Sequence, residues 1–128
     1  MERQLLDTAR KTKYPPGAFD FVRQGLDFTV RQVHGTSSDD EPEKSRHIKG
    51  RQLCLGLRNY AIEEYGLLAR TVLQHWGIHN CEDFGRIVFA LVDAGLMLKT
   101  DDDTIKDFAD VYDFKKAFSM ALTINKNG

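Results

Sequence analysis

Apolar residues recur every three or four positions along most of the chain, and this spacing constrains the fold more than any other feature of the sequence. Between residues 17 and 34 it places five apolar side chains on one helical face: Phe19, Val22, Leu26, Val30 and Val33. The same spacing predicts a short helix before Lys13 and further helices over 49–65, 67–76, 81–94 and 114–122. Amphipathic helices bury their apolar stripes against one another, so the fold class is mainly α.

Glycine, proline and capping residues divide these helical segments. The predicted breaks are at Tyr14-Pro15-Pro16, Gly35, Gly66, Gly77 and Gly95. Asn80, followed three residues later by Asp83, is typical of a helix N-terminus, and Asp113 is expected to cap the last helix. The segments therefore read as separate helices that fold back on one another.

The short segment after Gly95 leaves two architectures open. Leu96-Met97-Leu98 is too brief for its periodicity to distinguish a strand from an extended connection. As a connection, it belongs to a compact helical bundle. As a strand, Leu96–Thr100 begins a β-hairpin, and together with the helices over 67–76 and 83–94 it gives a winged-helix-like domain.

The length of the chain, 128 residues, is that of one domain, and we expect residues 1–128 to fold as a single unit. Residues 1–13 form its N-terminal helix. The small and acidic residues of 35–47 offer nothing sizeable to bury, so we expect a mobile loop there. Residues 124–128 are expected to fray.

Composition limits the cellular compartments and the binding partners expected for this chain. No apolar run approaches the roughly 18 residues of a membrane span, and two cysteines do not make a disulfide framework. We therefore expect a cytoplasmic protein with no membrane contact. The 18 Lys and Arg against 19 Asp and Glu leave a net charge of −1, which lacks the basic excess typical of nucleic-acid binding.

No residue pattern predicts catalysis, a metal or a cofactor. His75, His79 and Cys81 are ligand types that zinc accepts, but Gly77 and Ile78 separate the two histidines and break the helical i,i+4 relation. Cys54 lies at the edge of an apolar stripe and is interpreted as a small buried residue. We therefore assign no catalytic or metal-binding residue.

Glu64 is a charged residue at a position where the helical spacing predicts an apolar one. On a helical wheel it lies within about 20° of Leu53, inside the apolar stripe. A buried carboxylate needs a partner, so one interpretation is a buried ion pair or ligand site formed by Glu64 with Arg70, Arg58, Arg46 and His47. The other is that the helix ends before Glu64 or that its carboxylate reaches solvent.

Phe21 and Phe28 form a second conflict, because they lie on the wheel roughly opposite Phe19, with Gly25 between them leaving room for close approach. One interpretation is that the N-terminal helix covers them through Leu5, Leu6 and Ala9. The alternative is an exposed interface of Phe21, Gly25 and Phe28 that serves a homodimer or another partner.

Several segments together resemble a family of small bacterial helical proteins with no assigned activity. They are Tyr14-Pro15-Pro16 with Phe19 and Phe21-Val22; Arg46-His47 with Gly50 and Leu53; Glu64-Tyr65-Gly66 with Ala69; and Asp83-Phe84-Gly85 with Val88-Phe89, Leu91-Val92 and Ala94-Gly95-Leu96. The resemblance runs from about Tyr14 to Phe118. It implies no cofactor or partner and assigns no functional residue.

Three functions are compatible with this pattern. The first is a protein-interaction or regulatory module without catalytic activity, with an unknown protein partner or a second copy. The second is a winged-helix-like nucleic-acid binder, although Glu82 and Asp93 on the outer face of the would-be recognition helix disfavour nucleic acid. The third is an enzyme with an unrecognised site. A basic surface built from Arg23, Arg31, Arg46, Arg51, Arg58 and Arg70 would favour the second.

Overall fold

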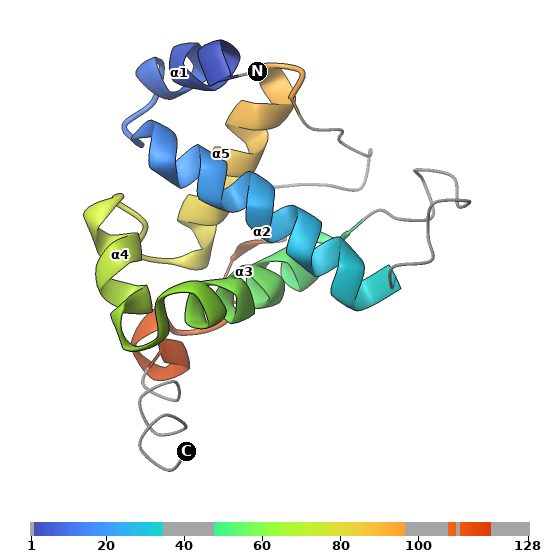
Figure 1. Cartoon of the computed structure of the whole chain (residues 1–128), viewed down its shortest axis with the longest axis vertical. Coiled ribbons are helices and arrows are strands. Elements are labelled where there is room, and N and C mark those ends of the chain that lie inside the picture. Colours follow the sequence, from blue (N-terminus) through green and yellow to red (C-terminus); the bar gives the residue numbers. More distant parts are fainter. Residues whose placement is uncertain (1, 35–47, 97–107, 110, 119–128) are drawn as a thin grey trace.

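The computed structural model describes residues 2–34, 48–96, 108–109 and 111–118. The helices in these ranges are α1 (Glu2–Arg10), α2 (Pro16–His34), α3 (Gly50–Tyr65), α4 (Ala69–His75) and α5 (Cys81–Asp93). A 3-10 turn, η3 (Gly66–Leu68), joins α3 to α4, and residues 114–118 are helical. The mainly α fold class is thus confirmed (Figure 1).

The β-hairpin expected after Gly95 has no support, since no strand occurs in the described ranges. Helix α5 instead ends at a left-handed glycine, Gly95 (φ 77°), and the Leu96 amide donates to the Leu91 carbonyl at 2.8 Å. This closure satisfies carbonyls at the end of the helix. Residues 97–100, which would continue the strand, lie outside the described residues, as do the 35–47 loop and the 124–128 tail.

Helix α2 is the centre of the arrangement. It packs against α1, α3 and α5, and it lies diagonally across the long axis of α3 in Figure 1. Helix α4 turns back at one end of α3, and the helical residues 114–118 lie beneath that same end. Segments far apart in the sequence thus meet around α2 and α3.

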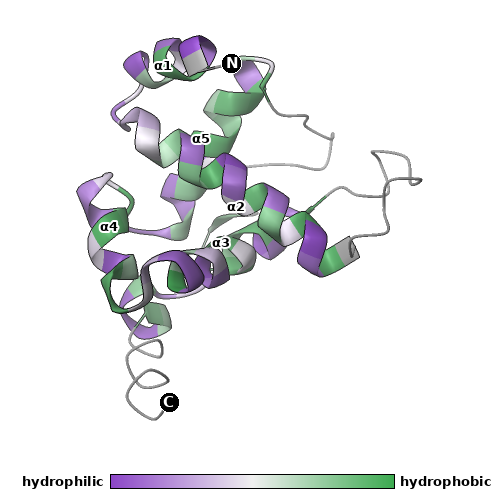
Figure 2. Cartoon of the chain, viewed as in Figure 1, coloured by the Kyte–Doolittle hydropathy of each residue, from purple (hydrophilic) through white to green (hydrophobic). Residues whose placement is uncertain are grey.

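The core follows the predicted apolar stripes. Apolar residues occupy the inward faces of the helices in Figure 2. The largest fully buried side chains come from α2, α3, α4, α5 and the loop before α5: Phe19, Leu57, Leu73, Ile78, Phe84, Ile87 and Leu91. Aromatic residues of the C-terminal segment complete it. Phe114 packs against Phe84, with ring centroids 5.6 Å apart, and against Phe118, at 5.3 Å.

Two glycines allow α2 and α3 to approach closely. A Cβ atom at Gly25 would overlap the end of the Leu57 side chain, and one at Gly56 would overlap Thr29. Thr29 is buried and donates its hydroxyl to the Gly25 carbonyl at 2.7 Å. Each helix therefore contributes a glycine that receives a side chain from the other.

Candidate functional site

The aromatic pair predicted as an interface belongs largely to this packing. Phe21 and Gly25 are buried, and Phe28 is half-buried. Phe21 lies against Tyr60 and Tyr65 of α3, Trp76 and Phe84, with ring centroids 5.3–6.4 Å apart. The exposed-interface interpretation is therefore wrong for Phe21, which is buried, and the rings that pack against it come from α3, the end of α4 and α5.

Glu64 lies in the last turn of α3, and its side chain is exposed. Of the two interpretations, burial is therefore wrong, and the carboxylate that reaches solvent is confirmed. A carboxylate at a helix end can reach water, which avoids the cost of desolvating a charge. Arg70 and Arg58 are half-buried; Arg58 donates to Asn59 and its guanidinium lies 5.8 Å from the centre of the Tyr112 ring. Arg46 and His47 lie outside the described residues.

Around Glu64 the structure gathers acidic and aromatic side chains of α2 and α3. Gln24 links the two helices: its amide nitrogen donates to Asp20 at 2.7 Å, and its amide oxygen accepts from the Tyr60 hydroxyl at 2.9 Å. Tyr65, the residue after Glu64, packs against Phe21 and Trp76. We call Asp20, Gln24, Tyr60, Glu64 and Tyr65 the acidic aromatic face.

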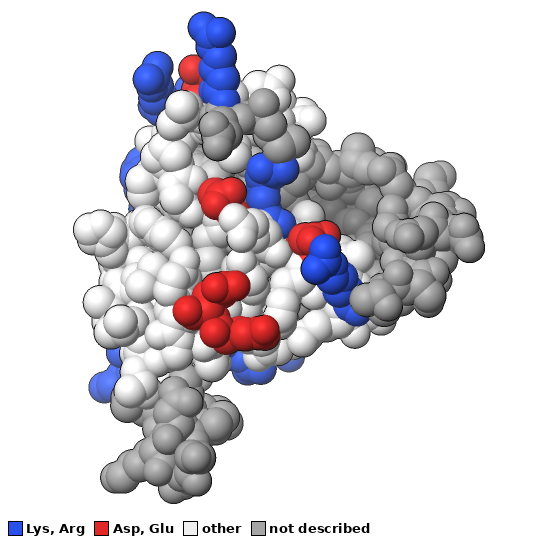
Figure 3. All heavy atoms as spheres, viewed as in Figure 1, with Lys and Arg blue, Asp and Glu red and all other residues white. Residues whose placement is uncertain are grey.

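The pKa values of the two tyrosines in this face are shifted by the nearby carboxylates. Burial raises the pKa of Tyr60, and the Glu64 carboxylate raises it further. The pKa of Tyr65 is raised by burial, by Glu64 and by Asp20. A nearby negative charge opposes ionisation of a phenol, so both carboxylates act on the same rings. Figure 3 shows several acidic side chains on this side of the molecule; basic side chains lie beside the upper ones, and uncharged atoms surround the lower group.

No basic side chain within the described ranges forms an ion pair with Asp20 or Glu64. The other acid of α2, Asp27, pairs with Arg31 one turn later at 3.0 Å. Asp20 and Glu64 are therefore like charges near the same two rings; Gln24 donates a hydrogen bond to Asp20, and Tyr60 also interacts with the Glu64 carboxylate. Two carboxylates without a basic partner create a negative potential that attracts a cationic group of another molecule.

Next to this face the chain presents two consecutive leucines to solvent. Leu67 is 54% exposed and Leu68 62% exposed, and both lie in η3. The turn is fixed at both ends: the Gly66 amide donates to Ile62, and the Ala69 amide donates to Gly66. Leu67 follows Glu64 by three residues, so their Cα atoms lie within about 10 Å. Exposed apolar side chains thus follow the acidic aromatic face within a few residues of the chain.

A second cluster surrounds Asp83 near the start of α5. This carboxylate is buried, at 3% exposure, and accepts hydrogen bonds from the Tyr14 hydroxyl (2.5 Å), the His79 amide (2.8 Å) and Arg86 (2.8 Å). Lys13 lies 3.9 Å away. Burial alone would raise the pKa of Asp83, but the hydrogen bonds and the two cations outweigh it and hold that pKa below its usual value. Asp83 thus fastens the 11–15 connection to α5.

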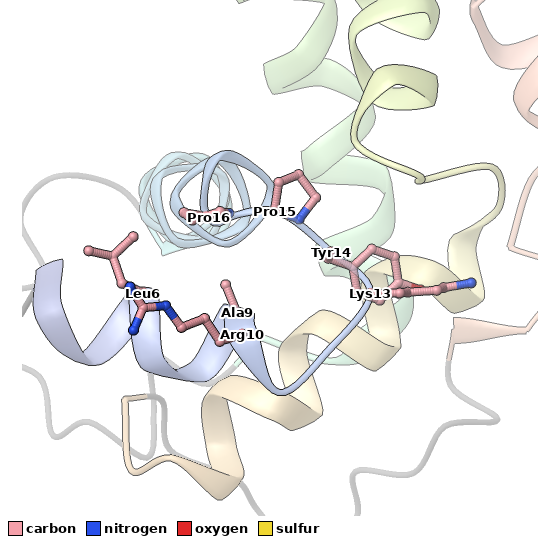
Figure 4. A pocket seen from close by; sticks show the side chains of 7 residues that line it. All are labelled: Leu6, Ala9, Arg10, Lys13, Tyr14, Pro15 and Pro16. Atoms are coloured by element: carbon pink, nitrogen blue, oxygen red, sulfur yellow. The ribbon is translucent and has the colours of Figure 1, made fainter.

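Beside this cluster lies an open groove between α1 and the start of α2. It has a volume of about 380 Å³, and Figure 4 shows its lining side chains: Leu6, Ala9, Arg10, Lys13, Tyr14, Pro15 and Pro16. The Tyr14 hydroxyl is engaged by Asp83, and Lys13 lies over the Tyr14 ring at 5.3 Å. The groove has no carboxylate, thiol or aliphatic hydroxyl among its lining residues, so it offers an apolar surface bordered by two cations.

The two cysteines, 27 positions apart in sequence, meet in the interior as free, buried thiols. Tyr112 bridges them: its carbonyl accepts from the Cys81 thiol at 3.5 Å, and its hydroxyl donates to the Cys54 carbonyl at 2.8 Å. A hydrogen bond between the thiols, together with burial, raises the pKa of Cys54. The prediction that Cys54 is a small buried residue is confirmed. The buried Cys54 thiol, with its raised pKa, is therefore a poor nucleophile, whereas its hydrogen bond lowers the pKa of Cys81.

The part of the chain that the structure describes contains no group of three or more His, Cys, Asp or Glu side chains arranged to hold a metal ion. Within the same ranges no helix is both long and apolar enough to cross a membrane. Neither Asp83 nor the acidic aromatic face was anticipated as a cluster. The sequence marks Asp83 only as part of a helix start, and the proximity of Asp20 and Glu64 to the same rings depends on which helices become neighbours.

Comparison with known proteins adds no relative: no protein-family model, curated protein or solved structure matches the chain. The resemblance to the small bacterial family therefore stays a prediction.

Proposed function

We propose that this chain is a protein-interaction module that acts without catalysing a reaction. The observation that carries the proposal is the pair of leucines in η3, each more than half exposed on a turn whose backbone is hydrogen-bonded at both ends. Burying apolar surface contributes about 25 cal/mol per Å², so a fixed apolar projection favours docking against a complementary surface. Anchors held in one conformation lose less entropy on binding.

The other clusters support binding rather than chemistry. The Asp83 carboxylate is saturated with hydrogen-bond donors, which is typical of a structural fastening. The two thiols are buried beneath Tyr112. Two of the arginines on which a nucleic-acid surface would depend are engaged elsewhere, Arg31 with Asp27 and Arg58 with Tyr112. These features favour the module over the enzyme and the nucleic-acid binder.

Site-specific photocrosslinking in the source cell tests this function. A benzophenone amino acid replaces Leu67 in the full chain, and a matched variant carries it at Lys11, an exposed position near the end of α1. We expect a discrete crosslinked protein from position 67 and none from position 11. Adding Leu68→Asp to the first variant should abolish the product without changing the melting temperature, since Leu68 is exposed. Equal, diffuse crosslinking from both positions would reject the proposal.

A further inference from the structure

The acidic aromatic face and the exposed leucines adjoin each other, and their chemistry specifies a partner. Asp20 and Glu64 lack an ion-pair partner in the described ranges, and both act on the Tyr65 ring. An arginine or lysine placed between them would gain two opposite charges and an aromatic face. A guanidinium also stacks on tyrosine rings, which favours arginine.

The rings of this face are held in position before any partner binds. Tyr60 is fixed by its hydrogen bond to Gln24 and by packing against Phe21 and Phe28. Tyr65 is held between Phe21 and Trp76. Both tyrosines are half-buried, so part of each side chain is packed in the protein and part is exposed to solvent. A partner therefore meets a surface whose aromatic groups need little ordering.

An organic cation fits this face better than a metal ion does. Calcium takes six to eight oxygen ligands, whereas the face offers two carboxylates and the amide of Gln24, which is already bonded to Asp20 and Tyr60. Nucleic acid is disfavoured by the negative sign of the charge. The leucines of η3 add an apolar contact that a free amino acid or a polyamine would leave unused.

We infer that the acidic aromatic face and Leu67–Leu68 together bind a cationic, amphipathic segment of a partner protein. An arginine or lysine of that segment enters between Asp20 and Glu64 beside the tyrosine rings, and a nearby apolar side chain covers the leucines. This inference rests on the proposed function and deepens it by naming the chemistry of the partner.

The test is selection of a displayed library of random twelve-residue peptides against the full chain. We expect the selected peptides to share a basic residue at a constant spacing from an apolar one. Isothermal titration with the best synthetic peptide then compares two double variants of equal charge. Asp20→Asn with Glu64→Gln should weaken binding tenfold or more, and 0.5 M NaCl should weaken binding of the unmodified chain similarly.

The matched control is Asp27→Asn with Glu63→Gln, which removes one charge from each of the same helices outside the face. It should change affinity less than threefold. Selected peptides that lack a basic residue, or equal effects of the two double variants, would overturn the inference, as would a library that yields no binder. Peptides whose binding depends on Leu67 and Leu68 of the chain, but which contain no basic residue themselves, would overturn the inference while leaving the proposed function intact. A sequence of the chain's own that competes for the site would identify the partner as a second copy.

Discussion

At the scale of single residues, the buried carboxylate of Asp83 shows how one side chain can join distant segments. Its donors come from Tyr14, 69 positions earlier, from the backbone of His79 and from Arg86 one turn later. Burial raises the pKa of Tyr14 to about 12, with the Asp83 carboxylate contributing in the same direction. The neutral phenol is therefore stabilised in the folded chain relative to the unfolded one, where its pKa is near 10.

The first prediction concerns Tyr14→Phe, which deletes the hydroxyl but keeps the buried ring. At pH 7 it should lower the free energy of unfolding by about 1–3 kcal/mol, because Asp83 loses a donor inside the protein. The contribution of the phenol is complete below pH 10 and disappears as the pH rises from about 10 to 12. Urea denaturation across this range should show the stability of the two proteins converging. A constant difference up to pH 12 would contradict the assigned hydrogen bond.

The sequence predicts individual residues well where their environment is local. Asn80 accepts from the Asp83 amide at 2.9 Å, as its spacing indicates, and the Asp113 side chain accepts from the Lys116 amide at 3.2 Å. Glu64 is different, since its burial depends on whether another element covers the last turn of α3. A helical wheel shows the direction in which each side chain points around the helix axis, but not where the neighbouring helices end. It therefore places the exposed Glu64 carboxylate inside the apolar stripe.

At the scale of elements, the crossing of α2 and α3 depends on the two glycines. The neighbour at Gly56 is the β-branched Thr29, whose Cβ, Cγ2 and Oγ1 all lie where a methyl group would be placed. The neighbour at Gly25 is the flexible end of Leu57, and Tyr60 is at ordinary contact distance. The two sites therefore differ in how far the surroundings can adjust.

The second prediction orders these two sites. Gly56→Ala should lower the free energy of unfolding by about 3 kcal/mol or more, because Thr29 can relieve the overlap only by separating the helices. Gly25→Ala should cost about 1–2 kcal/mol, because Leu57 can change rotamer. Chemical denaturation of both variants measures the order. Equal costs would contradict the described crossing, and each variant serves as the control for the other, since an alanine improves helix propensity at both positions.

The third prediction concerns the aromatic residues of α2. Phe21→Ala should lower the free energy of unfolding by about 3–5 kcal/mol, because the ring is buried among four others. Phe28→Ala should cost clearly less, because its ring is half-buried and packs against Tyr60 alone among the ring contacts described. Thermal melts in parallel with analytical ultracentrifugation provide the measurement. A Phe21→Ala protein of normal stability but altered association would restore the interface interpretation.

Helix boundaries were accessible from the sequence because their signals are local. Pro16, Gly66, Gly77 and Gly95 mark the ends that the structure shows, and the three glycines all have positive φ. The partner of each helix was not accessible in the same way. Nothing in the sequence indicates which helices supply the rings that pack against Phe21. Gly25 predicts a close approach of two helices but does not identify Leu57 as the neighbouring residue. Periodicity describes one helix, whereas packing is a property of two.

At the scale of the whole molecule, residues 111–118 close the core over α3 and α5. Phe114 stacks on Tyr112, with centroids 5.5 Å apart, and contacts Phe84 of α5. Tyr112 accepts a hydrogen bond from the Cys81 thiol and donates one to the backbone carbonyl of Cys54, next to both buried thiols. The reactivity of these thiols therefore reports whether the C-terminal segment is docked, independently of any function assigned to the cysteines.

The last prediction uses these thiols as the reporter. Phe114→Ala removes a buried ring and should lower the free energy of unfolding by about 3–5 kcal/mol. It should also speed the reaction of both cysteines with a disulfide reagent such as dithionitrobenzoate in native buffer, because the segment opens before α2, α3 and α5 separate. Gly56→Ala is the control, because it weakens the core at the α2–α3 crossing, away from the cover. At urea concentrations that give both variants equal global stability, the Phe114→Ala thiols should react several-fold faster. Equal rates would show that the thiols become accessible only by global unfolding and that residues 111–118 do not form a separately opening cover.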